Sequence, residues 1–300
     1  MFDFWTSFKN PVIYTPGDNE WSDCHKLGEG GHVHVNGEPV DYADGDPLAN
    51  LDLVRSIFFV NPGFSLGGRK KQVLSQAINF DSAFPTDAGY VENVMWEQSK
   101  VLFVTVNVPG GSNNDADNWF GAPRTQAQTD EIAQRSQADL HWLDAAFAQA
   151  TNDGAEAVVI MLQADMWDLD GKAVAHLANY EQFIGSIASH TLAFGKSVLL
   201  FNGDSHHYRS DNPLKQGQPC VFESGAAAVG CQAIPAAIDY SPDAWVNHPG
   251  YNVPNFHRVV VHGSTEPLEW LRLTIQPGTN APAGANAFGP FRWERVISQP

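Results

Sequence analysis

The segment from Asn202 to Tyr208, NGDSHHY, concentrates side chains that can bind a metal ion or transfer a proton. It contains Asp204, His206 and His207, and it directly follows the apolar run SVLLF. Carboxylate oxygens together with imidazole nitrogens suit borderline or hard divalent ions such as Mn, Fe or Zn better than soft copper. The segment therefore predicts a metal or proton-transfer site at the end of a buried strand.

Two other apolar runs end in residues of the same kind. The run PVIYT is followed by Asp18 and Asn19, and the run AVVIML is followed by Gln163 and Asp165. In open α/β sheets, ligands bind beyond the carboxyl ends of the strands, so three such ends predict one shared polar site. The alternative is coincidence, because Gly-Asp turns are common structural features.

Alternating strand and helix patterns are expected to position these strand ends. The order of patterns between residues 101 and 201 predicts βαβ units around a sheet that is buried on both faces. The segments FHRVVVHGS and EWLRLTIQP, near the C-terminus, predict an antiparallel hairpin. Gly195 is a candidate C-cap for the helix before it. Strands are predicted at 12–15, 101–108, 157–162, 198–201, 258–262 and 270–275, and helices at 48–59, 125–150 and 180–194.

The composition is that of a globular protein with an acidic surface. The 300 residues are 43% hydrophobic and 17% charged, without repeats or linker-like tracts, which predicts one domain over residues 1–300. A net charge of -17 disfavours nucleic acid and anionic membranes as partners. No apolar run has the length of a membrane helix, and the N-terminus lacks the pattern of a signal peptide.

The cysteines bear on the cellular compartment. Cys220 and Cys231 bracket the small-residue loop VFESGAAAVG, and Cys24 lies far from both in the sequence. A Cys220–Cys231 disulfide is expected in an oxidising compartment, whereas two free thiols are expected in a reducing one. The disulfide would favour a periplasmic or secreted protein.

Taken together, the motifs resemble those of the calcineurin-like metallophosphoesterases. PVIYTPGDNEW is similar to the strand and turn that carry the family's GNH(D/E) motif, and SVLLFNGDSHHY to the strand that carries GHxH. AVVIMLQAD lies where the family has an isolated metal-binding histidine. More narrowly, the chain resembles a bacterial branch of this family over about residues 4–277. The segments that carry this resemblance are YTPGDNEWSDCHK, DPLANLDLVRSIFF, VPGGSNN and NGDSHHYR. The resemblance implies an αββα two-sheet sandwich of metallophosphoesterase type.

The resemblance also implies a set of metal ligands. Asp18 falls where the family has a metal-binding Asn, Gln163 and Asp204 replace metal-binding histidines, and His206 matches the second His of GHxH. The implied cofactor is a divalent metal, Mn, Fe or Zn, at one or two positions. The implied function is metal-dependent hydrolysis of a phosphoester, as a phosphatase or a phosphodiesterase, on a small-molecule or other phosphoester substrate.

Further residues are expected to take part in catalysis and substrate binding. Asn19 falls where the family has the His that protonates the leaving group, and an amide is no general acid near pH 7. His207 is the second candidate catalytic residue. Asn113 and Asn114 follow a strand end and are candidate substrate-binding residues, although ordinary turn chemistry explains them equally well.

The chain departs from the family pattern at its N-terminus. The family begins with strands that end in DxH and GD, and neither motif precedes PVIYTPGDNEW, where only the helix-like MFDFWTSFKN stands. The sequence thus resembles an N-terminally truncated member, in which the lost metal ligands would impair hydrolysis. The alternative function is that of a catalytically inactive, metallophosphoesterase-like binding protein.

Overall fold

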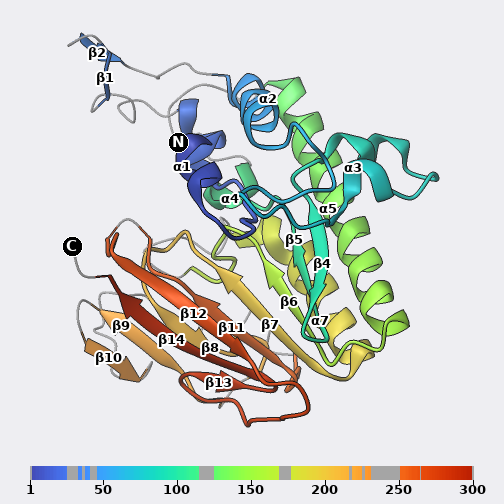
Figure 1. The fold of residues 1–300 in the computed structure, drawn as a ribbon, viewed down its shortest axis with the longest axis vertical. Coiled ribbons are helices and arrows are strands. Elements are labelled where there is room, and N and C mark those ends of the chain that lie inside the picture. Colours follow the sequence, from blue (N-terminus) through green and yellow to red (C-terminus); the bar gives the residue numbers. More distant parts are fainter. Residues whose placement is uncertain are drawn as a thin grey trace. The chain divides into compact units, whose positions relative to one another are not determined.

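The chain has a mixed α/β fold with a large mixed sheet and a small antiparallel sheet (Figure 1). The computed structural model describes residues 2–25, 33–35, 38–40, 46–114, 125–168, 177–215, 218–224, 227–230, 251–263 and 265–298. Two units can be distinguished, one formed by Met1–Trp96 with Thr105–Trp142 and the other by Glu97–Val104 with Leu143–Pro300. The assignment of a single domain stays a prediction.

The first unit is mainly helical. Strand β1 pairs antiparallel with β2, and β3 pairs antiparallel with β4. The elements of this unit are α1 (Phe2–Ser7), η1 (Asp18–Glu20), η2 (Ser22–His25), β1 (Val33–Val35), β2 (Glu38–Val40), α2 (Pro47–Phe58), β3 (Leu74–Ser75), α3 (Gln76–Asn79), η3 (Pro85–Gly89), β4 (Val94–Gln98), α4 (Gly110–Asn114) and the first part of α5 (Gln126–Asn152).

Helix α2 shows how the local sequence sets an element of this unit. Asp46 caps it by accepting a hydrogen bond of 3.0 Å from the Leu48 amide, and Pro47 occupies its first turn. Leu51 and Val54 point inward and pack in one cluster with the fully buried Trp21. The helix predicted at 48–59 is therefore confirmed.

The second unit contains most of the strands. Its elements are β5 (Val101–Thr105), the last part of α5, β6 (Ala157–Met161), η4 (Ala178–Tyr180), α7 (Glu181–Phe194), β7 (Ser197–Asn202), β8 (Arg209–Asp211), β9 (Val221–Ser224), β10 (Ala227–Gly230), β11 (Phe256–Val260), β12 (Glu269–Ile275), β13 (Ala287–Phe288) and β14 (Phe291–Ile297). The predicted C-cap is confirmed, because Gly195 closes α7 in the left-handed conformation with φ 69°.

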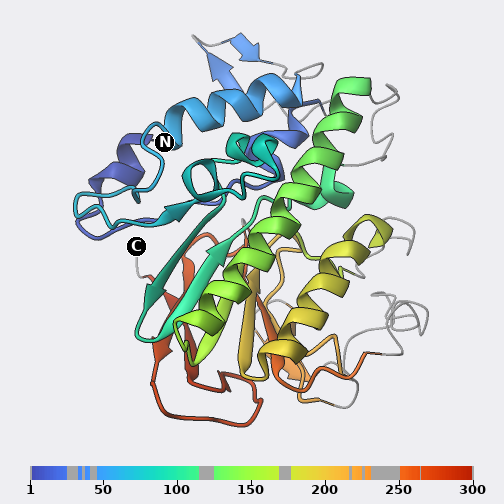
Figure 2. The ribbon, with the colours of Figure 1, turned by 90° about the vertical axis from the view of Figure 1, so that its right-hand side faces the viewer.

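In this unit the large sheet runs in the order β10-β9-β8-β11-β7-β6-β5. Strands β6, β7 and β11 are parallel neighbours, whereas β8, β9 and β10 pair antiparallel. Helix α7 and the end of α5 cover one face, where the ring of Phe147 stacks 4.9 Å from that of His190 (Figure 2). The small sheet, in the order β12-β14-β13, packs on the large sheet through Phe288 and Trp293, whose rings lie 5.3 and 5.4 Å from that of His257. The predicted βαβ sheet is thus covered by helices and by the small antiparallel sheet.

Two predicted elements are wrong. The two C-terminal runs do not form a hairpin, since β11 lies between β7 and β8, and β12 pairs with β14. Strand β11 is buried along its whole length, as interior strands are, whereas β12 alternates between more and less exposed residues. Residues 12–15 form no strand either: Val12 makes only an isolated bridge to Leu66, and Pro11 and Pro16 on either side lack the amide that a strand donates.

Buried His257 predicts a specific loss of stability in acid. Desolvation lowers its pKa to about 4, helped by Arg258 and opposed by Asp211. Because the unfolded chain binds the proton with a pKa near 6.5, the stability present above that pH is lost as pH falls toward 4, by about 3 kcal/mol. Urea unfolding at pH 7.5 and 4.5 should show this loss, and His257→Phe should make it smaller by a similar amount. An equal pH dependence in both proteins would contradict the assignment.

Candidate functional site

The ends of three parallel strands meet at the NGDSHHY segment of the second unit. The Gly203 amide donates a hydrogen bond of 3.0 Å to the Gln163 carbonyl, which follows β6. The Val261 amide, which follows β11, donates one of 2.8 Å to the Asn202 carbonyl at the end of β7. The carboxyl ends of parallel strands are the usual place for ligands in α/β sheets. The structure therefore places Gln163 beside the turn that carries Asp204 and His206.

The backbone of this turn is strained. Asp204 has φ 71° and His206 has φ 61°, a left-handed region that side chains other than glycine rarely adopt. Such residues cost about 1–3 kcal/mol each and concentrate at active sites and ligand-binding sites. Within the described chain, the other left-handed residues besides glycine are Ser99, Lys100, Ser112, Asn113 and Asn114. Ser99 and Lys100 form the turn between β4 and β5. The other left-handed residues lie in two segments that contain predicted site residues, one with Asp204 and His206 and the other formed by Ser112–Asn114.

A buried chain of charges holds the turn. The Asp165 amide donates to Asp204 Oδ2 (3.3 Å), and Ser205 Oγ donates to Asp165 Oδ2 (2.8 Å). Arg258 Nη1 donates to Asp165 Oδ1 (2.6 Å), while its Nε and Nη2 bind both oxygens of Asp211 at 2.9 and 2.8 Å. Arg258 thus connects the core of the sheet to the turn through Asp165.

The pairing with Arg258 is strong enough to offset burial. Burial alone would raise the pKa of the Asp211 carboxyl, but the charge and hydrogen bonds of Arg258 hold that pKa below its usual value. The guanidinium also lies over the ring of Trp167, 5.1 Å from its centre. The roles of Arg258 and Asp211 were missed by sequence reasoning, and the available signal was an arginine inside an otherwise apolar run.

The position of His206 depends on the segment after β11. Thr265 Oγ1 donates a hydrogen bond of 2.8 Å to the His206 carbonyl. A Cβ atom on Gly263 would lie 3.0 Å from His206 Nδ1 and 3.2 Å from its Cγ, closer than side chains normally pack. The neighbouring His207 places its ring 5.5 Å from that of Phe222. The lack of a side chain at Gly263 is therefore what leaves room for the His206 ring.

We expect Gly263→Ala to displace the His206 ring and to lower the metal-dependent hydrolysis predicted from the sequence by roughly 10-fold or more, since small displacements of reacting groups are costly. Thermal unfolding should change little. Gly89→Ala is the matched control, because nothing lies within 4 Å of a Cβ there. Equal turnover in both variants would contradict this account of Gly263.

The other predicted site residues belong to the first unit. In η1, Asp18 is half-buried and Asn19 is exposed, and Asp18 Oδ1 accepts a hydrogen bond of 2.8 Å from the Asn19 amide. Glu20 closes the turn by accepting one of 2.8 Å from the Gly17 amide. The left-handed turn labelled α4, which carries Asn113 and Asn114, contacts η1. Within this unit the structure thus brings the two predicted segments together.

The two predicted asparagines differ in their surroundings. Asn113 is fully buried, donates to Ser136 Oγ (2.9 Å) and accepts from Arg135 at 2.5 Å. Asn114 is half-buried, and its Nδ2 has no hydrogen-bond partner within the described part of the chain. Asn114 therefore carries a covered donor to which no described residue offers an acceptor.

The donors available for a metal are few. In the described ranges, no three His, Cys, Asp or Glu side chains converge as a metal site requires. The turn of the second unit carries Asp204 and His206, and the backbone of Gln163 lies beside it. An ion held by this set would complete its coordination with water or substrate oxygen atoms.

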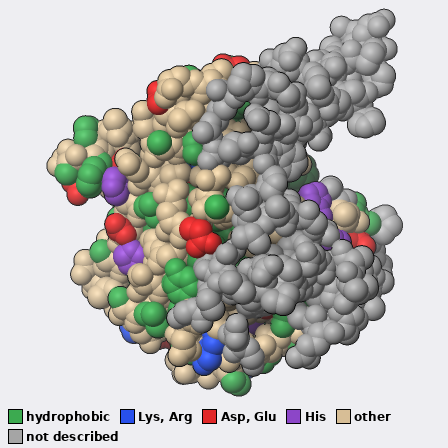
Figure 3. Space-filling view, turned by 180° about the vertical axis from the view of Figure 1, so that it is seen from behind, with side chains coloured by type: hydrophobic (Ala, Val, Ile, Leu, Met, Phe, Trp, Pro, Cys, Tyr) green, Lys and Arg blue, Asp and Glu red, His purple; other side chains and the backbone are tan. Residues whose placement is uncertain are grey.

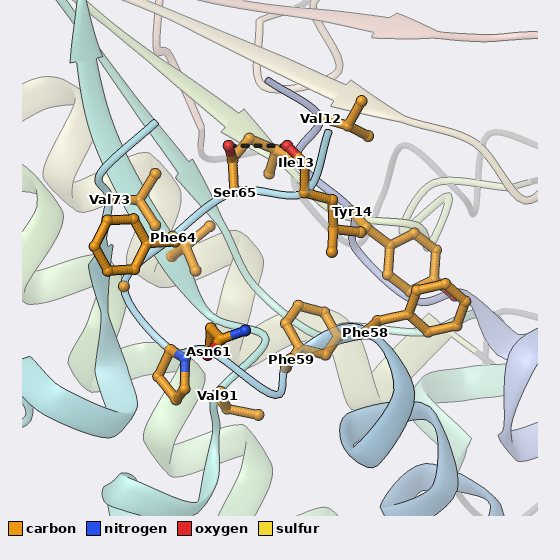
Figure 4. A pocket seen from close by; sticks show the side chains of 14 residues that line it. Val12, Ile13, Tyr14, Phe58, Phe59, Asn61, Phe64, Ser65, Val73 and Val91 are labelled. Atoms are coloured by element: carbon orange, nitrogen blue, oxygen red, sulfur yellow. Dashed lines mark hydrogen bonds between the residues drawn. The ribbon is translucent and has the colours of Figure 1, made fainter. Parts of the chain in front are cut away.

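The apolar hollow of the first unit is no substrate site. It has a volume of about 20 Å³, roughly the space for a single water molecule. Figure 4 shows the rings of Tyr14, Phe58 and Phe59 at its side, with Phe64 and Val73 across from them. A phosphoester would find neither the room nor the charge that it needs there.

The acidic surface does not attract anions in general, so an anionic ligand would have to be recognised by a few specific groups. The net charge is -17, and Lys and Arg side chains occupy little of the described surface on the face drawn in Figure 3. An anionic ligand would therefore need close donors or a bound cation. None of the helices in the described ranges combines the length and apolar character needed to cross a membrane.

The cysteines are partly described. Cys220 is disulfide-bonded, and Cys24 is a free thiol whose pKa is raised to about 11 by burial and by the charges of Asp46 and Asp23. Cys231 lies outside the described residues. The compartment of the protein stays a prediction.

Comparisons with family models, with curated proteins and with solved structures gave no match. The resemblance to metallophosphoesterases consequently rests on the sequence motifs.

Proposed function

We propose that the protein is a metal-dependent phosphoester hydrolase in which Asp204 and His206 bind the metal. The observation that carries the proposal is the strained backbone: both residues are left-handed, and so are Asn113 and Asn114 of the predicted substrate segment. Strain of this kind persists only where surrounding contacts impose it, and Arg258 and Thr265 supply such contacts at the first of these turns.

The residues of the second unit would each have a distinct task. Asp204, His206 and Gln163 would hold the ion, which would supply charge neutralisation and an acidified water when bound. Ser205 and Asp165 would keep the Asp204 carboxylate in place through their hydrogen bonds. Ligand roles for Asp18, and catalytic roles for Asn19 and His207, remain part of the proposal on the strength of the resemblance.

The finer fold assignment belongs to the same proposal. We infer an αββα sandwich of metallophosphoesterase type. The inference is supported by the second unit, where helix α7 covers the large sheet and the small sheet packs on it through His257. The proposal expects the small sheet to correspond to the family's second sheet.

The test is hydrolysis of p-nitrophenyl phosphate and bis-p-nitrophenyl phosphate with added Mn, Zn or Fe. Metal-dependent turnover that is lost on chelation and restored by metal is the expected result. The ratio of the two rates tells a phosphatase from a phosphodiesterase. Turnover that survives exhaustive chelation would contradict the proposal.

A second candidate function is that of a catalytically inactive, metallophosphoesterase-like binding protein. The exposed amide of Asn19 favours it, because it stands where a proton donor is expected and cannot serve as an acid near pH 7. This candidate predicts phosphate or phosphoester binding with no turnover under any of the metal conditions.

A further inference from the structure

The connection between β11 and β12, in the second unit, is closed by a hydrogen bond between a histidine and a carboxylate. His262 Nδ1 lies 2.8 Å from Glu269 Oε1, and the two side chains are only 4% and 5% exposed. An ionised carboxylate only accepts hydrogen bonds, so Nδ1 carries the proton and is the donor. Inside the connection, the Glu266 amide donates to the Gly263 carbonyl (3.2 Å) and the Glu269 amide to the Glu266 carbonyl (3.0 Å). The two ends of the connection are thereby tied together.

The carboxylate of Glu269 is itself held by an arginine of β14. Arg295 Nε donates to Glu269 Oε1 (2.8 Å) and its Nη2 donates to Oε2 (2.5 Å), a two-point pairing that fixes the orientation of the carboxylate. The guanidinium also pairs with Glu223 of β9 and lies over the ring of Tyr208, 4.8 Å from its centre. The acceptor that His262 binds is therefore fixed by contacts to both sheets of this unit.

The connection closed by Glu269 contacts His206 at two places. Gly263, which directly follows His262, lies so close that a Cβ atom there would be 3.0 Å from His206 Nδ1. Thr265 Oγ1 donates a hydrogen bond of 2.8 Å to the His206 carbonyl. His206 has φ 61°, a backbone conformation that persists only where surrounding contacts impose it. A shift of the connection would therefore displace both the ring and the backbone of His206.

The small sheet holds the NGDSHHY segment at a second residue as well. Trp293 Nε1 of β14 donates a hydrogen bond of 2.9 Å to Tyr208 Oη, and both side chains are buried. Tyr208 lies two residues after His206, so the small sheet fixes the end of the segment directly. Its other link to the segment runs through Glu269 and His262 to the contacts on His206.

We propose that Glu269 is a positioning residue for His206: it orients His262, and the connection fixed in this way holds His206 in the geometry that binds the metal. The metal assignment rests on the proposed function. The positioning of His206 rests on the contacts described above and applies with or without a bound ion. His262 acts here through its Nδ1–H group, so it need not contact the metal.

The test compares Glu269→Ala, His262→Ala and His262→Asn with the wild type. The Kd of Mn²⁺ is measured by calorimetry, and the rate of p-nitrophenyl phosphate hydrolysis is followed as Mn²⁺ is added. We expect both alanine variants to raise the Mn²⁺ Kd by about 10-fold or more, the usual result of removing a partner that orients a metal ligand. His262→Asn should bind Mn²⁺ like the wild type, because its side-chain amide can donate a hydrogen bond in place of Nδ1.

A further variant covers the case in which Glu269→Ala does not fold. Glu269→Gln keeps the size of the side chain but turns one acceptor oxygen into a donor, which then faces the N–H groups of Arg295 or His262. It should therefore also raise the Mn²⁺ Kd. The matched control is Glu294→Ala, since Glu294 is another carboxylate of the small sheet and pairs with Arg272 at 2.7 Å, but is 58% exposed. It should leave the Mn²⁺ Kd within about 2-fold of wild type.

Proton–carbon NMR spectra of the histidine rings give a readout that needs no metal. The His206 signals are identified by their loss in His206→Ala. Without metal they should shift in Glu269→Ala, Glu269→Gln and His262→Ala, because the ring is displaced. They should stay in place in His262→Asn and Glu294→Ala.

The outcomes separate this inference from the hydrolase proposal. His206 signals that shift in the Glu269 variants, together with a wild type that shows no turnover, would keep the positioning of His206 and contradict the hydrolase. Turnover with an unchanged Mn²⁺ Kd in both Glu269 variants would overturn the inference and keep the hydrolase. The positioning role would also be overturned by His206 signals that do not move in the Glu269 variants, by an equal loss in Glu294→Ala, or by a His262→Asn variant as defective as His262→Ala.

Discussion

Replacing Arg258 with Met should lower the free energy of unfolding by about 3–5 kcal/mol, because it leaves two buried carboxylates without their partner. The guanidinium is 1% exposed and binds both Asp165 and Asp211. Urea unfolding at pH 7 measures the change. Arg258→Lys, which keeps the charge but loses the forked geometry, should be less destabilised and gives a folded variant for comparison.

The control and the pH dependence make this prediction specific. Arg272 pairs with Glu294 at 2.7 Å and lies over the ring of Trp270, but the pair is 51% and 58% exposed. Arg272→Met should therefore cost less than about 1 kcal/mol. In Arg258→Met the buried Asp211 carboxyl loses the charge that holds its pKa down, so this variant should gain stability relative to wild type as the pH falls from 7 to 5. Equal losses in Arg258→Met and Arg272→Met would contradict the account.

Asp204→Ala and His206→Ala should each reduce metal-dependent turnover by about 100-fold or more, because each removes a proposed metal ligand. Thermal unfolding without metal should change by only a few degrees, since both side chains are half-buried. Calorimetric titration with Mn²⁺ should show weaker binding in both variants.

The pair Asp144 and His190 provides a matched control in the same unit. Among the described residues, no hydrogen bond joins Asp144 to a proposed site residue, and its carboxylate lies 2.5 Å from His190 Nε2 between α5 and α7. Asp144→Ala and His190→Ala should keep wild-type turnover and metal affinity. A loss of turnover as large as in the Asp204 and His206 variants would contradict the assignment of ligands.

Much of the fold could be predicted because its signals are local. The helical periodicity over residues 48–59 and 180–194, together with Gly195, located α2 and α7 to within a residue or two. The pairing of strands is not local. An uninterrupted apolar run such as β11 signals an interior strand, but the sequence contains nothing that specifies β7 and β8 as its neighbours.

The residues of the candidate site could be proposed from the sequence, but the contacts that hold them in place could not. The strand-end pattern predicts Gln163, Asp204 and His206 as site residues, and the structure places the backbone of Gln163 beside the turn that carries the other two. The buried arginines escaped notice, because their role depends on partners far along the chain: Asp165 and Asp211 for Arg258, Asn107 and Asn113 for Arg135. The small size required at Gly263 likewise appears only when His206 lies against it.

The most direct test of the central claim is the initial rate of p-nitrophenyl phosphate hydrolysis by chelator-treated protein, measured as Mn²⁺ is added back. The account predicts that the rate rises with Mn²⁺ to saturation in the wild type and in His190→Ala, and that it stays at background in Asp204→Ala and His206→Ala. A rate that is independent of Mn²⁺, or that responds to Mn²⁺ equally in all four proteins, would contradict a metal-dependent hydrolase centred on this turn.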